Sequence, residues 1–129
     1  MSVAEAFDKL EAHFGSPPVA DRARFEAEGV ALSASSGELH FVPRGKKGTE
    51  LLFKGEFLVD SGGMRIQSEG QTVWSTGFEE MKAISVEVKN LLHFRIGEKL
   101  YQLRFPDQSP LKWDHFLRKW RLHVAGSER

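Results

Sequence analysis

The sequence predicts a mainly β fold, a sandwich or partly open barrel of about seven antiparallel strands capped by one C-terminal helix. Two patterns predict it. Apolar and polar residues alternate in short runs between glycine-containing turns, which is typical of strands with one buried face. The C-terminal segment instead places large apolar residues at helical spacing. We expect a single domain over 1–129, with a helix at 2–14, the β sandwich or barrel at 25–105 and the capping helix at 110–124.

The chain begins with a short amphipathic helix. Ser2 and Glu5 form a capping box, and Gly15 followed by Ser16-Pro17-Pro18 ends the helix. Its apolar stripe consists of Val3, Phe7, Leu10 and Phe14. A helix of this length is not stable alone, so it must dock. Its own domain is the favoured surface, and a partner or second copy is the alternative.

The next segment is ambiguous. Ser16-Pro17 could start a second short helix that ends near Gly29, but Phe25-Glu26-Ala27 also begins a strand pattern. We favour a turn or a single helical turn at 19–24, followed by a strand from about Phe25 to Ala34 with Gly29 as a candidate bulge. Ser35-Ser36-Gly37 predicts a turn into a strand from Glu38 to Pro43.

Three further strands follow in the middle of the chain. Alternation predicts the longest one around Leu51, Phe53, Phe57 and Val59, with Gly55 as a bend. Turns at 61–63 and 69–70 separate it from strands at 64–67 and 72–75. Trp74 is expected either to pack normally or to lie on a rim as a binding anchor.

The stretch from Ile84 to Val124 contains the last three predicted strands and the helix that caps the β structure. Strands at 84–88, 91–96 and 100–105 precede the helix, and Gly97-Glu98 joins the last two as a hairpin. Their aromatic face needs a cover. Ser109 as N-cap and Pro110 at the first helical position start a helix whose inner stripe is Trp113, Phe116, Leu117, Trp120 and Val124. We expect this stripe to be buried, the alternative being a ligand or membrane contact.

The opposite face of this helix carries a second stripe, made of Leu111, His115, Arg118 and Leu122. Leucines that face away from the sandwich suggest a second contact. We expect the N-terminal stripe to lie there. Phe7, Leu10, Phe14, Leu111 and Leu122 are therefore the candidate partner-contact residues, and a monomer is favoured over a dimer because the linker is long enough for an intramolecular contact.

A strand-rich domain ending in one helix with an inward tryptophan resembles the pleckstrin-homology superfold, in particular its GRAM-like branch. The segments Asn90–Phe94, Leu100–Phe105 and Ser109–Trp113 are also similar to C-terminal extensions of bacterial acyl-glycerol-phosphate acyltransferases. The catalytic motif of those enzymes, a histidine followed five residues later by aspartate, is absent, so no catalytic role is carried over.

The best candidate site is a basic, glycine-rich loop at 44–48, which we call the basic loop. It consists of Arg44, Gly45, Lys46, Lys47 and Gly48. Cations and freed backbone amides together suit a phosphate or lipid headgroup, and pleckstrin-homology domains that bind phosphoinositides also use basic loops between early strands. A solvated turn is the alternative.

The composition of the chain excludes several classes of function. Eighteen basic and eighteen acidic residues give no global field for nucleic acid, and the absence of cysteine excludes disulfides and thiolate chemistry. No pair of histidines has metal-ligand spacing, and no nucleophile or phosphate-binding motif is present. We expect no cofactor, no metal and no catalysis. Without an apolar run that spans a bilayer or a signal-peptide pattern, a cytoplasmic protein is expected, peripheral at the membrane if it binds lipid.

Two functions remain. The first is a non-catalytic interaction module that binds an anionic lipid headgroup or a protein partner through the basic loop. The alternative is an accessory domain of acyltransferase-linked lipid metabolism without a catalytic site of its own.

Overall fold

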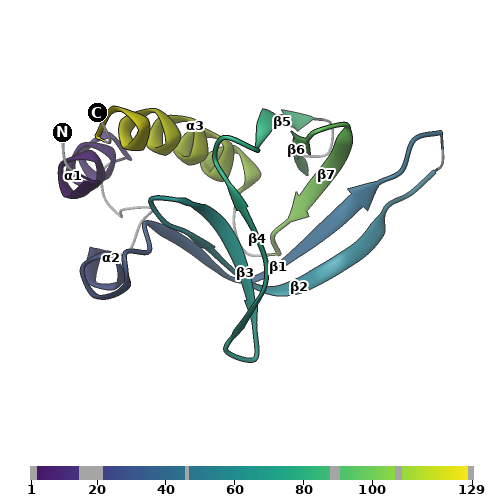
Figure 1. Ribbon diagram of the computed structural model, residues 1–129, viewed down its shortest axis with the longest axis horizontal. Helices are drawn as coiled ribbons and strands as arrows, with labels where there is room; N and C mark the ends of the chain where they lie inside the picture. Colours follow the sequence, from purple (N-terminus) through teal and green to yellow (C-terminus); the bar gives the residue numbers. More distant parts are fainter. Residues whose placement is uncertain (1–2, 15–21, 46, 88–90, 107–108, 128–129) are drawn as a thin grey trace.

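The computed structural model describes residues 3–14, 22–45, 47–87, 91–106 and 109–127. Its strands form one antiparallel sheet in the order β4-β3-β2-β1-β7-β6-β5 (Figure 1). The strands are β1 (Leu32–Val42), β2 (Glu50–Val59), β3 (Gly63–Ser68), β4 (Gln71–Gly77), β5 (Lys82–Glu87), β6 (Leu91–Ile96) and β7 (Lys99–Arg104). The helices are α1 (Val3–Phe14), α2 (Arg22–Glu28) and α3 (Pro110–Ser127). The predicted mainly β class, with seven antiparallel strands, an N-terminal helix and a C-terminal helix, is confirmed.

The sheet curls so that its two halves face each other. Strand β1 pairs with β2 on one side and with β7 on the other, which leaves β4 and β5 as the two ends of the sheet. The ring of Trp74 on β4 lies 6.3 Å from those of Phe94 on β6 and Tyr101 on β7. A curled sheet whose end strands do not pair is compatible with the pleckstrin-homology-like fold that the resemblance implies. Trp74 is half-buried in this contact, so its ring packs against the opposite half of the sheet.

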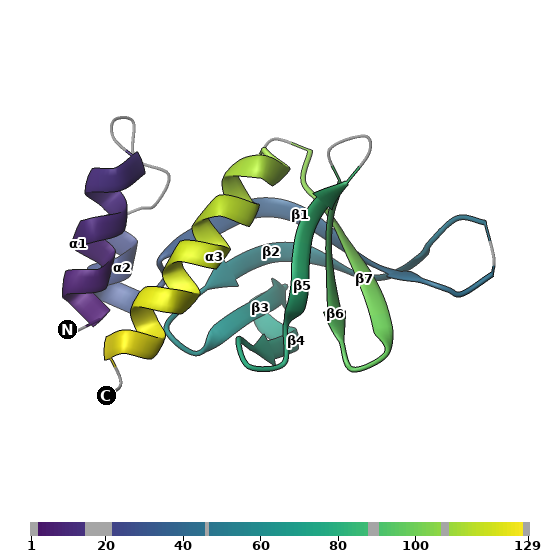
Figure 2. The same cartoon turned by 90° about the horizontal axis from the view of Figure 1, so that it is seen from above.

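Helix α3 fills the open side of this sheet (Figure 2). Its inner stripe is fully buried, as expected for a capping helix: Trp113, Phe116, Leu117 and Trp120 have 0% exposure and Val124 has 4%. Trp113 stacks on Phe105, just after β7, with ring centroids 4.4 Å apart. The indole N–H of Trp120 donates to the carbonyl of Asp60, just after β2, at 2.8 Å. The helix is therefore joined to both halves of the sheet.

Two arginines of α3 reach the edge of β5. Arg118 donates to the carbonyl of Ile84, and Arg121 Nη1 donates to the carbonyl of Met81 at 2.9 Å. Unpaired carbonyls at a sheet edge are a template for pairing with another chain. Arg118 satisfies one carbonyl of β5, Arg121 satisfies the carbonyl of the residue just before the strand, and the two side chains cover part of this edge.

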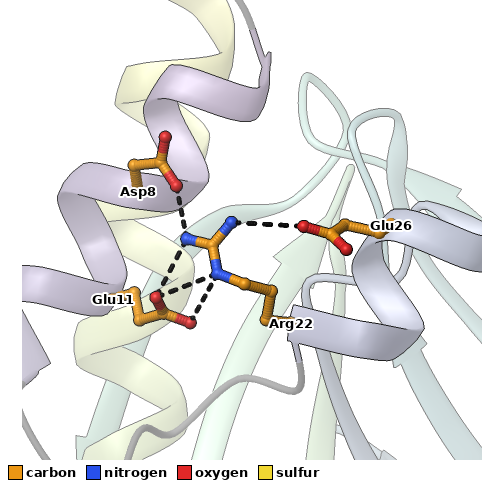
Figure 3. Close-up of polar contacts among 4 residues, drawn as sticks. All are labelled: Asp8, Glu11, Arg22 and Glu26. Carbon is orange, nitrogen blue, oxygen red and sulfur yellow. Dashed lines mark hydrogen bonds and ion pairs between the residues drawn. The ribbon is translucent and has the colours of Figure 1, made fainter.

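Helix α1 docks within its own chain. Phe7 is 0% exposed, Leu10 is 1% exposed, and the Phe7 ring stacks on Phe25 of α2 at 4.1 Å. Arg22 joins the two helices because its guanidinium donates to Asp8 and to Glu11 (Figure 3) and lies 5.0 Å over the Phe7 ring. The favoured docking of the N-terminal helix on its own domain is what the structure shows.

The surface on which α1 docks differs from the prediction. It contacts α3, but Leu111 and Leu122 stay 59% and 67% exposed, so the expected cover of that outer stripe is wrong. Phe7 and Leu10 instead join the main hydrophobic core. The side chain of Phe14 lies outside the described residues.

Helix α1 docks away from the predicted surface because Phe25, on which Phe7 stacks, belongs to a helix. Residues 22–28 form α2, where a strand was predicted from Phe25. Gly29 is the C-cap of this helix rather than a bulge, with φ of 76° and its N–H donating to the carbonyl of Phe25 at 2.8 Å. Arg24 binds Glu28 within the helix and Glu56 on β2, both at 2.8 Å, which anchors α2 to the sheet.

The turn predicted at 35–37 is also wrong, because β1 runs without a break from Leu32 to Val42. Its register against β2 shifts between Ala34 and Gly37, so the segment is a β-bulge. Gly37 pairs with Gly55 of β2 at this point. A Cβ at Gly55 would lie 2.2 Å from the backbone oxygen of Gln67, so glycine is required for the close approach of β3.

The predicted hairpin turns are confirmed. Glu69-Gly70 joins β3 to β4 with φ of 53° and 80°, and Gly97 begins the turn from β6 to β7 with φ of 61°. The β2–β3 turn is held by Asp60, whose Oδ1 accepts the N–H groups of Gly62 and Gly63 at 2.8 and 3.1 Å. In the described part of the chain, no helix combines the length and hydrophobicity needed to cross a bilayer.

We predict that Trp120→Ala lowers the free energy of unfolding by about 3–5 kcal/mol, because it leaves a large cavity and an unpaired Asp60 carbonyl. Denaturant titration followed by circular dichroism measures the change. Leu122→Ala on the exposed face of the same helix is the control and should change stability by less than about 0.5 kcal/mol. An unchanged midpoint for Trp120→Ala would contradict the capping role of α3.

We predict a pH-dependent contribution from the Arg24–Glu56 pair. The hydrogen bond from Arg24 lowers the pKa of Glu56 from its ordinary value of 4.5. A depressed folded-state pKa stabilises the fold above the unfolded-state value, and that contribution disappears as pH falls through the folded-state value. Glu56→Gln should therefore cost about 1 kcal/mol at pH 7, and the cost should shrink as pH falls below 4.5.

Stability curves of both proteins between pH 7 and pH 3 test this. Glu28→Gln is the matched control, because it removes the more exposed partner of Arg24 and should cost less than about 0.5 kcal/mol at pH 7. A constant difference between wild type and Glu56→Gln at all pH values would contradict the role assigned to this pair.

Candidate functional site

The basic loop lies at the tip of the β1–β2 hairpin, which projects away from the body of the molecule (Figures 1 and 2). Arg44, Gly45, Lys47 and Gly48 are all exposed there. Gly45 and Gly48 have φ of 69° and 84°, a left-handed conformation that other residues adopt only with strain, which explains both glycines. Lys46 lies outside the described residues.

A hollow of about 350 Å³ lies beside this loop. Three cations line it, Arg44 from the loop and Arg95 and Lys99 from the two sides of the β6–β7 turn. One acid, Glu98, lines it as well. The remaining lining is apolar and consists of Phe41, Val42, Pro43 and Leu100. The excess of positive charge favours an anionic ligand.

Strand pairing brings these cations together. Val42 at the end of β1 pairs with Leu100 at the start of β7, so the root of the basic loop lies beside the β6–β7 turn. Leu100 pairs in turn with Arg95 on β6. Sequence reasoning selected the loop but missed Arg95 and Lys99, because the only signal that places them there is the pairing of β1 with β7.

Two exposed leucines lie on the β2 arm of the same hairpin. Leu51 is 52% exposed and Leu52 is 38% exposed. The register against β1 passes from Phe53 directly to Leu51, so Leu52 is the extra residue of a bulge. Adjacent strand residues ordinarily point to opposite faces, yet both are exposed because the hairpin extends beyond the packed part of the sheet.

A partly buried polar network lies at the base of this hairpin. His40 Nε2 is 2.8 Å from Glu38 Oε1, and His40 Nδ1 is 3.0 Å from Thr49 Oγ1. The hydrogen bond with His40 lowers the pKa of Glu38. Arg104 Nη2 donates to the Thr49 hydroxyl oxygen at 3.1 Å. The network therefore ties β7 and the start of β2 to β1.

The network continues across the outer face of the sheet. Arg104 Nε donates to Gln102 Oε1 at 2.6 Å, and Gln102 Nε2 lies 3.2 Å from His93 Nε2. Because the amide oxygen accepts from Arg104, the amide nitrogen donates to His93 Nε2, and neutral His93 carries its proton on Nδ1. That Nδ1 atom is buried and has no hydrogen-bond partner among the residues that the structure describes.

A carboxylate, an imidazole and a hydroxyl in sequence are also the parts that activate a hydroxyl nucleophile. Here the imidazole of His40 is only 6% exposed, so we interpret the network as a structural connection. Within the described ranges, no three histidine or acidic side chains form a group that could hold a metal ion. The predicted partner-contact residues separate into two sets: Phe7 and Leu10 lie in the chain's own core, whereas Leu111 and Leu122 are exposed.

Comparison with known proteins yields a likeness in fold only. No family model matches the chain, and no curated protein matches it. Among solved structures, the chain is similar to the one titled "Crystal structure of Dcp1p", with a TM-score of 0.47 and 11% sequence identity over 81% of this chain and 92% of that chain. A likeness this weak supports no inference about activity or partner.

Proposed function

We propose that the chain is a non-catalytic, pleckstrin-homology-like interaction module that binds an anionic lipid headgroup between its basic loop and its β6–β7 turn. The observation that carries the proposal is the convergence of Arg44, Arg95 and Lys99 on one hollow. Three cations from two separate segments can contact one phosphate group from different sides, and arginine does so with paired N–H donors.

The surroundings of the hollow favour a lipid surface over an acidic protein. Leu51 and Leu52 are exposed on the same projecting hairpin. A membrane offers anionic groups and hydrocarbon side by side, so it can pair with the cations and cover the leucines together. A protein surface that offers acidic groups alone pairs with the cations but leaves the leucines without an apolar partner. The acyltransferase-linked role stays a prediction from the sequence.

We predict that the protein co-sediments with vesicles containing phosphatidylserine and not with vesicles of phosphatidylcholine alone. Arg95→Gln/Lys99→Gln should weaken this binding by about 2 kcal/mol in total, or roughly 30-fold in the partition coefficient, because each cation near an anionic membrane surface contributes about 1 kcal/mol. Added salt should weaken the binding of the wild type.

The matched control is Lys9→Gln/Lys119→Gln, which removes the same charge from exposed positions on α1 and α3. This variant should bind like the wild type. Equal binding by both double variants would show that the hollow is not the site. If the wild type does not co-sediment with anionic vesicles in low salt, the lipid proposal is refuted. A protein partner would then remain as the candidate ligand of the hairpin.

A further inference from the structure

A second hollow lies at the other end of the molecule from the basic loop. It has a volume of about 830 Å³ and is formed by three segments: the β2–β3 turn, the β4–β5 turn with the start of β5, and the last turns of α3. In Figure 1 the C-terminal end of α3 and the tip of the β1–β2 hairpin lie at opposite ends of the long axis. This hollow is therefore independent of the site proposed for headgroups.

The floor of the second hollow is the edge of the hydrophobic core. Phe78, Met81 and Val124 line it, and all three belong to the main cluster of buried apolar residues. They are 7%, 0% and 4% exposed, so only a thin apolar surface is open to solvent. A ligand with a slender apolar body fits such a floor better than a large planar one.

The rim is polar and carries two cations. Lys82 from the start of β5 is exposed, and Arg121 from α3 is half-buried. Arg121 donates one of its five N–H groups to the carbonyl of Met81, which fixes the guanidinium at the rim. Ser61 contributes a hydroxyl, and Glu79 is the one acid among the described residues that line the hollow. Two cations against one acid leave a net positive rim.

The backbone at this rim is strained. Ala83, between Lys82 and the rest of β5, has φ of 53°, which a residue with a Cβ rarely adopts. It lies in the irregular register of β5 between Lys82 and Ser85. Such conformations are energetically unfavourable and cluster at ligand sites, where they redirect a side chain or open a surface.

We propose that this hollow binds a small amphipathic anion, a single carboxylate on a slender aliphatic chain. The carboxylate pairs with Lys82 and Arg121, and the aliphatic chain covers the exposed edges of Phe78 and Val124. A hollow of about 830 Å³ lies within the range of small-molecule sites, which combine an apolar lining with a few placed polar groups. The site adds a small-molecule ligand to a domain whose proposed function concerns a surface at the other end.

The test is a titration of the ¹⁵N-labelled 129-residue chain with octanoate, followed by amide chemical shifts. Two further ligands separate the contributions of charge and hydrocarbon: acetate has the carboxylate without the chain, and 1-octanol has the chain without the charge. We expect octanoate to shift the amides of Gly62, Lys82, Ala83 and Arg121 in a saturable way, and acetate and octanol to bind at least about fivefold more weakly.

Three variants check the assignment. Lys82→Gln changes an exposed side chain and should weaken octanoate about fivefold, since it removes one cation from a partly exposed pair. Ser61→Trp, also at an exposed position, should block the hollow and abolish the shifts without unfolding the protein. Lys99→Gln at the headgroup hollow should bind octanoate like the wild type.

Several results would overturn the proposal. Amide shifts that spread evenly over the surface, or that are confined to the β1–β2 hairpin, would place octanoate elsewhere. Octanol that binds as tightly as octanoate would show that the carboxylate is not recognised. A Lys82→Gln variant that binds octanoate like the wild type would show that Lys82 is not part of the site. Because the vesicle assay uses a different surface and different variants, failure here leaves the headgroup proposal standing, and the reverse also holds.

Discussion

The structure depends on the burial of one helix face against a sheet that does not close on itself. Strands β4 and β5 are the unpaired ends of the sheet, so its curled interior would be open without α3. Trp113 stacks on Phe105 beyond β7, and Trp120 both packs in the core and donates to the Asp60 carbonyl beyond β2. One helix thus connects the two halves of the sheet and supplies the largest fully buried side chains.

This arrangement divides the molecule into a packed end and a projecting end. At the packed end, α1 and α2 add Phe7 and Phe25 to the aromatic contacts around Trp120, and charged pairs from Arg22 and Arg24 fix the helices to each other and to β2. At the projecting end, the β1–β2 hairpin extends beyond the core (Figure 2), and the polar network around His40 supports its base. Because the hairpin lies outside the hydrophobic core, its cations and leucines are exposed and can contact a ligand. The packed end determines the stability of the fold.

The sequence predicts what local patterns determine. Period-2 alternation and glycine turns identify the strands, and the 3.6-residue spacing of Trp113, Phe116 and Trp120 identifies the cap. Prediction from the sequence fails where contacts between residues far apart in the chain determine the local structure. Residues 25–27 fit a strand and a helix equally well, and the stacking of Phe25 on Phe7 together with the pairing of Arg24 with Glu56 selects the helix. The candidate site shows the same limit, because the glycines of the loop are local signals, whereas Arg95 and Lys99 reach the hollow only through the pairing of β1 with β7.

Native-state hydrogen exchange tests the central claim, that α3 makes both halves of the sheet one cooperative unit. The account predicts that the slowest amides of β1 and β2, of β6 and β7, and of α3 around Trp113 and Trp120 exchange with the same free energy and respond equally to denaturant. Release of α3 at a lower free energy, while the amides of both halves of the sheet remain protected, would contradict it.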